Sequence, residues 1–321
     1  MTAPRKPSLR AFFAIATTLL TLSGCNRSRQ AAIKPMTALR PQATFTVKGT
    51  PDWMAVAQDS VWVTSSAANL VSQLRATDNQ PGLTIPVNKP CSGLAIGFGS
   101  IWIPGCGQGN IIRADLSTGT IQAVIPIGPA DSEGGITIGA GSVWLMTDPS
   151  GVLSRIDPAT NSVIATIPIP PGSFCPLFAE GFVWITSTDN NVLTKVDPSI
   201  NKVVLQIPVG KKPRFLTFGA DSIWTLNQGD GTITRVSTKA NQRIADISAQ
   251  LPGHGGEIAF GFGSVWATMP NKPITRIDAT TSTIISQWIG AGGDSIRTGL
   301  GSVWLTDYNT GKIWRLSPES L

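Results

Sequence analysis

The 321-residue sequence is poor in several residue types that carry chemistry, since it has one histidine, one tyrosine and four cysteines, and only 14% of its residues are charged. A single histidine excludes any site that requires two or more imidazole groups. Stretches rich in glutamate, lysine and alanine are also scarce, which argues against a helical protein. Hydrophobic residues nevertheless make up 41% of the chain, which excludes a disordered protein and suffices for a full core without disulfides.

Glycine, proline and tryptophan are abundant, with 33, 24 and ten copies. Together with many threonine, isoleucine and valine residues, they favour short strands joined by turns. The formal net charge is +6, and three of the positive charges lie in the first ten residues. Lysine and arginine form no run beyond Lys211-Lys212. The sequence therefore lacks the clustered basic face of a nucleic-acid-binding protein, and we expect no nucleic-acid partner.

The N-terminal residues have the parts of a secretory signal peptide. A basic start is followed by an apolar stretch at residues 11–22, which is shorter than the about 20 residues that a transmembrane helix needs. The sequence then reads Leu22-Ser23-Gly24-Cys25, which resembles a bacterial lipobox. The resemblance predicts a signal peptide over residues 1–24 and a lipid on Cys25. An ordinary signal peptide with an incidental cysteine is the alternative.

The lipobox resemblance also implies where the protein acts. Asn26 follows the cysteine, and a residue other than aspartate at this place implies sorting to the outer membrane in a host with two membranes. We therefore expect a protein of the bacterial cell envelope, held in the outer membrane by the lipid on Cys25 and facing the periplasm. Residues 25–42 have no periodic pattern and contain proline, which predicts a tether between the lipid and the folded domain.

An internal repeat dominates the rest of the sequence. Seven segments share a pattern of glycine or aspartate, usually serine, then valine or isoleucine and tryptophan, and successive tryptophans lie 38 to 42 residues apart. The seven tryptophans are Trp62, Trp102, Trp144, Trp184, Trp224, Trp266 and Trp304. A period of this length over seven copies is typical of a repeat protein. We expect these tryptophans to pack between neighbouring units.

Each repeat contains four short strand signals separated by turn residues. In one repeat the predicted strands are residues 135–139, 143–147, 152–157 and 163–169. Pro168 lies in the last of them and cannot donate a backbone hydrogen bond, so this strand belongs at an outer edge. Four-stranded antiparallel units repeated in a circle form a β-propeller, so the sequence predicts an all-β fold, a seven-bladed β-propeller.

The two ends of the chain predict how the ring closes. The last repeat has only three strand signals, at residues 295–299, 303–307 and 312–316. Residues 43–49 resemble the missing fourth strand, so we expect the N-terminal strand to complete the seventh blade and remove the open edge. The propeller would then span residues 43–317 as one domain, followed by a short tail at 318–321.

The repeated pattern, seen as GSVW at 141–144, RIDPAT at 155–160 and IPVG at 207–210, resembles the YVTN-type seven-bladed propellers, which are similar to streptogramin (virginiamycin B) lyase. The resemblance covers nearly the whole chain after the tether. It is specific for the fold, whereas propellers of this kind have many unrelated functions. A basic residue recurs before a turn in six repeats and is expected to be structural, at Arg113, Arg155, Lys195, Arg235, Arg276 and Arg315.

Candidate functional residues lie where the repeats differ from one another. The loops that lead into the first strand of each blade open at the mouth of the central channel and carry charged or aromatic residues that do not recur. The candidate binding residues are Trp53, Glu133, Phe174, Arg214, His254, Glu257 and Asp294, together with Arg297 in a first strand. Asp52, Cys91, Ser92 and Cys175 lie in the same loops. Polar residues that merely face a water-filled channel are the alternative.

These residues favour a binding protein over an enzyme. We expect a rigid ring that presents its channel-mouth loops to an unidentified small molecule or envelope protein, with tryptophan and arginine as anchors. In the alternative, His254 and Glu257 serve as base and acid of an enzyme or bind a divalent metal. The resemblance to streptogramin lyase implies a magnesium ion at the channel mouth, but that enzyme relies on more than one histidine. An enzyme predicts that His254, Glu257 and a third acid such as Asp294 converge on one cavity.

The cysteines favour a disulfide in an oxidising compartment. We expect Ile96 to lie opposite Ile101 across a hairpin. The same register places Cys91 opposite Cys106, which predicts a bond that stabilises the fold by roughly 3 kcal/mol. Cys175 is then left over, either buried or as a free thiol. Metal ligation by Cys91, Cys106 and Cys175 is the alternative.

Overall fold

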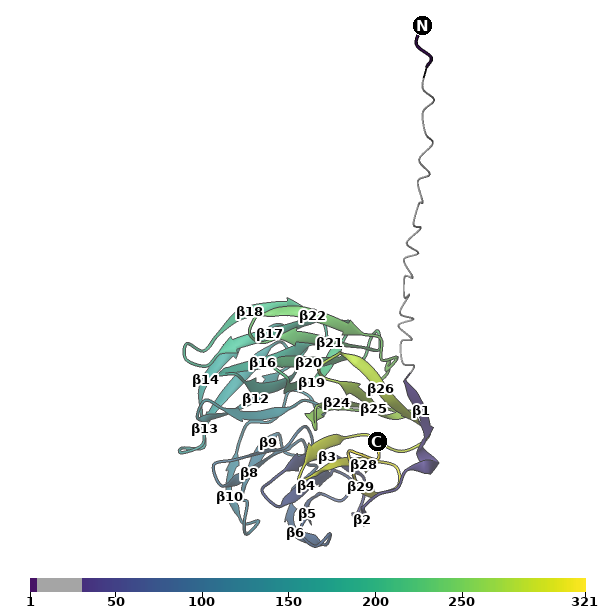
Figure 1. The fold of residues 1–321 in the computed structure, drawn as a ribbon. Helices are drawn as coiled ribbons and strands as arrows, with labels where there is room; N and C mark the ends of the chain where they lie inside the picture. The colour runs from purple at the N-terminus through teal and green to yellow at the C-terminus, as the bar shows by residue number, and fades with distance from the viewer. Residues whose placement is uncertain (5–30) are drawn as a thin grey trace. The chain divides into compact units, whose positions relative to one another are not determined.

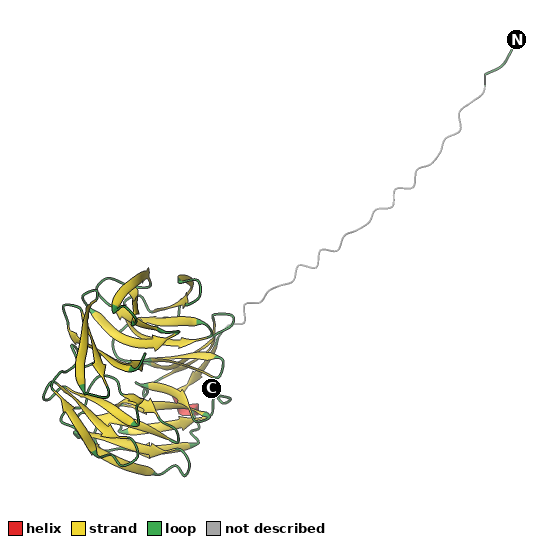
Figure 2. Cartoon of the chain, turned by 90° about the vertical axis from the view of Figure 1, so that its left-hand side faces the viewer, coloured by secondary structure: helices red, strands yellow, loops and turns green. Residues whose placement is uncertain are grey.

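Strands make up nearly all the regular structure of the chain (Figure 2). The computed structural model describes residues 1–4 and 31–321, so most of the expected signal peptide and the expected lipidation site, Cys25, lie outside the described residues. Residues 31–321 form one unit, in which the only helix is the short 3₁₀ helix η1 (Met36–Ala38). No helix in the described part of the chain is long and apolar enough to cross a membrane.

The strands form seven sheets, which are the blades of a propeller (Figure 1), and each blade has four antiparallel strands. Blade one consists of β3 (Pro51–Val56), β4 (Ser60–Ser65), β5 (Leu70–Arg75) and β6 (Pro81–Pro86). Blade two consists of β7 (Ala95–Gly97), β8 (Ser100–Gly105), β9 (Asn110–Asp115) and β10 (Ile121–Ile125). Blade three consists of β11 (Ile136–Gly139), β12 (Ser142–Asp148), β13 (Val152–Asp157) and β14 (Ser162–Pro168). Blade four consists of β15 (Ser173–Ala179), β16 (Phe182–Ser187), β17 (Val192–Asp197) and β18 (Lys202–Pro208). Blade five consists of β19 (Pro213–Gly219), β20 (Ser222–Asn227), β21 (Thr232–Ser237) and β22 (Gln242–Ile247).

The last two blades include strands from the N-terminal part of the described chain. Blade six consists of β23 (Ile258–Gly261), β24 (Ser264–Met269), β25 (Lys272–Asp278) and β26 (Thr283–Ile289), with β1 (Ala32–Pro35) as a fifth strand. Blade seven consists of β27 (Ile296–Gly299), β28 (Ser302–Asp307), β29 (Lys312–Leu316) and β2 (Ala43–Thr46). The predicted fold, an all-β propeller with seven blades, is confirmed.

The ring closes as the sequence predicts. The first strand of each blade contacts the first strands of both neighbouring blades, and β27 of blade seven contacts β3 of blade one. Strand β2 pairs with β29 in antiparallel register, from Ala43 opposite Arg315 to Thr46 opposite Lys312. The N-terminal strand therefore completes the last blade and joins the two ends of the propeller.

Recurring tryptophan and basic residues hold neighbouring blades together. In blade three, Trp144 is fully buried and its indole Nε1 donates a hydrogen bond to the Gly139 carbonyl oxygen at 2.9 Å. Arg155 stacks 5.0 Å over that indole and donates to Ser142 Oγ and to the Pro198 carbonyl oxygen of blade four, both at 2.8 Å. Similar stacking and inter-blade contacts occur at Arg113, Arg276 and Arg315. The recurring basic residues therefore have a structural role.

The segment before the propeller is folded in part. Strand β1 lies parallel to β26 at the outer edge of blade six. The pairing runs from Ala32 opposite Ser286 to Pro35 opposite Ile289. At the other end, Leu321 is buried and its carbonyl oxygen accepts a hydrogen bond from Ser286 Oγ at 2.8 Å. The folded region thus extends to Ala32 and Leu321, beyond the boundaries at 43 and 317 that the sequence predicts.

Blade two contains the expected disulfide. Ile96 lies opposite Ile101, and Cys91 and Cys106 are bonded with their Cα atoms 5.8 Å apart. The bond joins the loop before β7 to the end of β8, on the channel-mouth side of the blade. Because these two cysteines are bonded to each other, they do not form a metal site with Cys175, which is free and half-buried.

Candidate functional site

Two adjoining cavities lie at the channel mouth. The first, which we call the arginine cavity, has a volume of about 290 Å³, and its lining includes Phe174, Lys212, Arg214, Gln228 and His254. The second, which we call the acidic cavity, has a volume of about 510 Å³, and its lining includes Asp52, Glu133, Asp294 and Tyr308. Arg214 and His254 line both cavities. The loops that lead into the first strands thus bring most of the candidate residues to one end of the ring.

A third cavity, the channel cavity, lies among the first strands and has a volume of about 240 Å³. Its lining includes Trp53, Cys175, Glu257 and Arg297, which all belong to the candidate residues or their loops. Burial raises the pKa of the Cys175 thiol to about 12, and the negative charge of Glu257 adds to this shift. The thiol is therefore protonated at neutral pH and is a poor nucleophile.

The acidic cavity holds carboxyl groups that retain their protons more strongly than usual. The pKa of Asp52 is raised to about 8, first by burial and then by the negative charges of Asp294, Glu133 and Glu257. Burial also raises the pKa of Glu133, although the charge of Arg214 opposes the shift. Asp52 is therefore largely protonated at neutral pH, and the cavity can both donate and accept hydrogen bonds.

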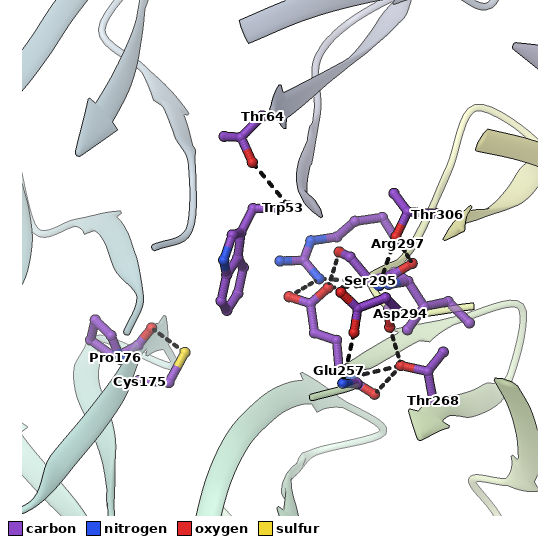
Figure 3. Close-up of polar contacts among 12 residues, drawn as sticks. Trp53, Thr64, Cys175, Pro176, Glu257, Thr268, Asp294, Ser295, Arg297 and Thr306 are labelled. Atoms are coloured by element: carbon purple, nitrogen blue, oxygen red, sulfur yellow. Dashed lines mark hydrogen bonds and ion pairs between the residues drawn. The ribbon is translucent and has the colours of Figure 1, made fainter. Parts of the chain in front are cut away.

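Glu257 is fully engaged in contacts between blades six and seven (Figure 3). Its Oε1 forms an ion pair with Arg297 Nη1, and its Oε2 accepts hydrogen bonds from Ser295 Oγ and, at 3.1 Å, from the Ile296 backbone amide. Only 4% of the Glu257 side chain is exposed. Burial raises the pKa of this carboxyl, and the ion pair with Arg297 opposes that shift. Glu257 and Arg297 therefore fasten the two blades inside the channel.

A glycine lets the chain turn Glu257 into the channel. Gly256 has a φ of +71°, and a Cβ at this position would collide with the Thr268 carbonyl oxygen. Its backbone amide donates to Asp294 Oδ1 at 2.9 Å, which opposes the rise that burial causes in the pKa of Asp294. The next amide, that of Glu257, donates to Thr268 Oγ1 at 2.6 Å. These contacts fix the loop that separates the acidic cavity from the channel.

Aromatic residues form the floor between the cavities. Phe215 packs edge-on against both Trp53 and Phe174, with ring centroids 5.5 and 5.6 Å apart. Arg214 lies 4.1 Å above the Phe174 ring. Trp53 was expected at the rim as an anchor, but only 4% of it is exposed, and its amide donates to Thr64 Oγ1 at 3.1 Å (Figure 3). Trp53 therefore supports the site from below.

The sequence did not identify Gln228, which follows β20. Only 4% of this residue is exposed, and its Nε2 donates to the Gly255 carbonyl oxygen at 2.6 Å. Its Oε1 is buried and has no hydrogen-bond partner among the described residues, a state that costs about 1–3 kcal/mol. The signal in the sequence is its place in the turn after the second strand, where polar residues are common for the sake of the turn itself. Tyr308 reaches the acidic cavity from the same turn of blade seven.

The structure separates His254 from Glu257. His254 is exposed and lines the two mouth cavities, whereas Glu257 is buried and faces the channel. Both carboxylate oxygens of Glu257 are already occupied by Arg297, Ser295 and the Ile296 amide. Among residues 1–4 and 31–321, no group of three His, Cys, Asp or Glu side chains is placed to hold a metal ion. The residues therefore do not fit a magnesium site built on His254 and Glu257.

Comparison with known proteins finds similarity at the level of structure. No family model and no curated protein matches the chain. The structure of a streptogramin B lyase aligns with 85% of this chain and 96% of its own, at 20% identity and a TM-score of 0.71. The chain shares the propeller fold of this lyase. A catalytically inactive virginiamycin B lyase from Staphylococcus aureus, solved with quinupristin, aligns with 86% of this chain and 98% of its own, at 20% identity and a TM-score of 0.73.

Proposed function

We propose that this chain is a bacterial cell-envelope protein that binds a small molecule at its channel mouth. The observation that carries this proposal is the pair of adjoining cavities, of about 290 and 510 Å³, that share Arg214 and His254. Cavities of this size suit small ligands. A protein partner would instead be expected to cover a broader and flatter surface. The fold is a rigid support for such a site, because every loop of the mouth begins and ends in a blade.

Replacing His254 by tryptophan is expected to weaken ligand binding strongly and to leave the protein folded. The His254 side chain is exposed at the border of both cavities, so an indole there would fill the space of a ligand without removing a core contact. The measurement is a small-molecule library screen by ligand-observed NMR on the signal-free protein, followed by titration of each binder. Binding is expected to weaken at least tenfold in the variant.

The matched control is Lys239→Gln, in an exposed turn between β21 and β22 at the opposite end of the ring. A library without any binder, or binders that His254→Trp leaves unaffected, would contradict the proposal. A molecule that the protein converts chemically would instead support an enzyme.

A lyase-like enzyme is the second candidate. The observation that favours it is that Asp52, whose raised pKa of about 8 keeps it largely protonated at neutral pH, lines the same cavity as the exposed His254. A proton donor and an imidazole in one cavity are a possible acid and base. Metal dependence is not supported by the residues, because Glu257 is committed to Arg297.

We also propose that the ring is held at a membrane by a lipid on Cys25, as the lipobox resemblance implies. The folded region begins at Ala32. Residues 26–31 would then span at most about 20 Å between the lipid and β1. This is a short link, so the propeller would lie close to the membrane surface.

Replacing Cys25 by serine is expected to remove the protein from the outer membrane of a Gram-negative host. The full-length chain should sediment with the outer membrane, and mass spectrometry should find acyl chains on its N-terminal peptide. The variant should be missing from the outer-membrane fraction and should carry no acyl chains, because serine has no thiol to receive the lipid. A wild-type chain that is soluble and carries no acyl group would contradict the anchor.

A further inference from the structure

Arg214 is held in one orientation by aromatic rings. Its guanidinium carbon lies 4.1 Å from the centre of the Phe174 ring and 5.5 Å from that of Phe215. Such stacking uses the flat face of the guanidinium and leaves the N–H groups at its edge free. Phe215 in turn packs edge-on against Phe174 and Trp53. The aromatic floor therefore fixes the position of the charge.

The edge of this guanidinium has no protein partner in the described part of the chain. No hydrogen bond or ion pair joins it to another described side chain, and it stacks on Phe174 and Phe215. The positive charge of Arg214 opposes the rise that burial causes in the pKa of Glu133, but the two side chains do not form an ion pair. The arginine side chain carries five N–H donors in a fork that matches a carboxylate. An arginine held this way is prepared for an external anion.

Gln228 supplies a second unpaired group in the same cavity. Its amide is oriented by the hydrogen bond from Nε2 to the Gly255 carbonyl oxygen, which leaves Oε1 as the atom without a partner. Its backbone amide donates to the Lys212 carbonyl oxygen at 3.0 Å, so the residue is fixed at both ends. A buried carbonyl oxygen of this kind calls for a hydrogen-bond donor. The amide N–H next to a carboxylate in an N-acyl amino acid is such a donor.

The charges around the cavity permit an anion to bind at Arg214. Lys212 adds a second positive charge to the lining, and Asp131 and Asp189 are the acids on it. Asp131 Oδ1 accepts a hydrogen bond from the Glu133 backbone amide at 2.8 Å, which ties it to its own turn. Asp189 lies in the exposed turn after β16. Neither acid forms an ion pair with Arg214.

We propose that the arginine cavity binds the carboxylate of an N-acyl amino acid, the group that ends every peptide chain. Arg214 would hold the two carboxylate oxygens, and Gln228 Oε1 would accept the neighbouring amide N–H. This proposal rests on the proposed function and names the chemical class of its ligand. The streptogramin-lyase fold does not imply it, because it depends on Arg214, Phe174 and Gln228 of this chain.

The experiment compares two mixtures of N-acetyl dipeptides that end in each of the twenty amino acids. One mixture has free carboxylates and the other has C-terminal amides. Each is incubated with the signal-free protein, and the retained peptides are identified by affinity-selection mass spectrometry. We expect the acids to be retained at least tenfold over the matching amides.

Two variants locate the binding to the arginine cavity. Arg214→Gln removes the charge and should reduce the ratio of acids to amides to about one. Gln228→Glu keeps the shape of the side chain and places a negative charge beside the ligand, so it should weaken binding of the acids at least tenfold. Lys239→Gln is the control and should behave as wild type. The melting temperature of each variant shows that it is folded.

Equal retention of acids and amides by the wild type, or a preference that survives in Arg214→Gln, overturns this inference. If the dipeptides do not bind, but library molecules bind to the wild type and not to His254→Trp, only the ligand class is wrong. If neither the dipeptides nor the library gives a binder, the proposed function fails as well. The two screens therefore separate the ligand class from the existence of the site.

Discussion

Replacing Arg297 by methionine is expected to lower the free energy of unfolding by about 3 to 5 kcal/mol at neutral pH. The substitution removes the partner of Glu257, whose side chain is only 4% exposed. The hydrogen bonds from Ser295 and Ile296 would remain, but they do not neutralise the carboxylate. The measurement is a urea titration followed by tryptophan fluorescence, which reports on the ten tryptophans of the fold.

Two further variants test the cause of this loss. Combining Arg297→Met with Glu257→Gln removes the buried charge and should recover most of the stability. Lys239→Met breaks the exposed pair with Asp221 and should cost at most about 1 kcal/mol. The loss in Arg297→Met should also shrink at pH 5, because a protonated Glu257 no longer needs a partner. A loss no larger than that of Lys239→Met would show that the pair does not hold the blades.

The sequence predicts the propeller because each blade repeats its local signals seven times. The tryptophan pattern fixes the second strand, and prolines such as Pro168 mark the outer edge. The absence of a fourth strand signal after Leu316 identifies β2 as the closing strand, since a ring requires a partner for β29. These conclusions need no knowledge of side-chain contacts, which explains why they agree with the structure.

The roles of the site residues depend on contacts between blades and could not be predicted. Glu257 follows His254 by three residues, but Gly256 turns its side chain toward Arg297 of the next blade. Nothing in the loop sequence specifies that partner, which lies forty positions later. Gln228 was overlooked for a similar reason, because its unpaired Oε1 is a property of the assembled mouth.

Strand β1 was also beyond prediction from sequence. Its four residues, Ala32–Pro35, have no alternation of apolar and polar side chains. The strand forms because the outer edge of β26 is open and because Lys34 lies 4.9 Å over the Trp288 ring. Both causes depend on the folded blade six, so part of the segment that the sequence predicts to be a tether belongs to the sheet.

The stability of the protein is expected to fall as the pH rises from about 4 to about 8, with Asp52 as the main cause. The pKa of this carboxyl is about 8 in the folded protein against an ordinary value of 3.8. The unfolded chain thus releases the proton near pH 4, while the folded protein keeps it until about pH 8, so unfolding is favoured increasingly across this window. Between pH 5 and pH 8 the loss is expected to be on the order of 4 kcal/mol.

The variant Asp52→Asn should lack this contribution, so its stability should depend less on pH and should exceed that of the wild type at pH 9. Glu133 and Asp294 act in the same direction, since burial raises the pKa of each, so some pH dependence should remain. Asp59→Asn, at an exposed hairpin turn of blade one, is the control and should follow the wild type. Urea titrations from pH 5 to pH 9 measure all three proteins. Parallel curves for the wild type and Asp52→Asn would mean that Asp52 is ionised at neutral pH, and the acidic cavity would then carry a negative charge that favours cationic ligands.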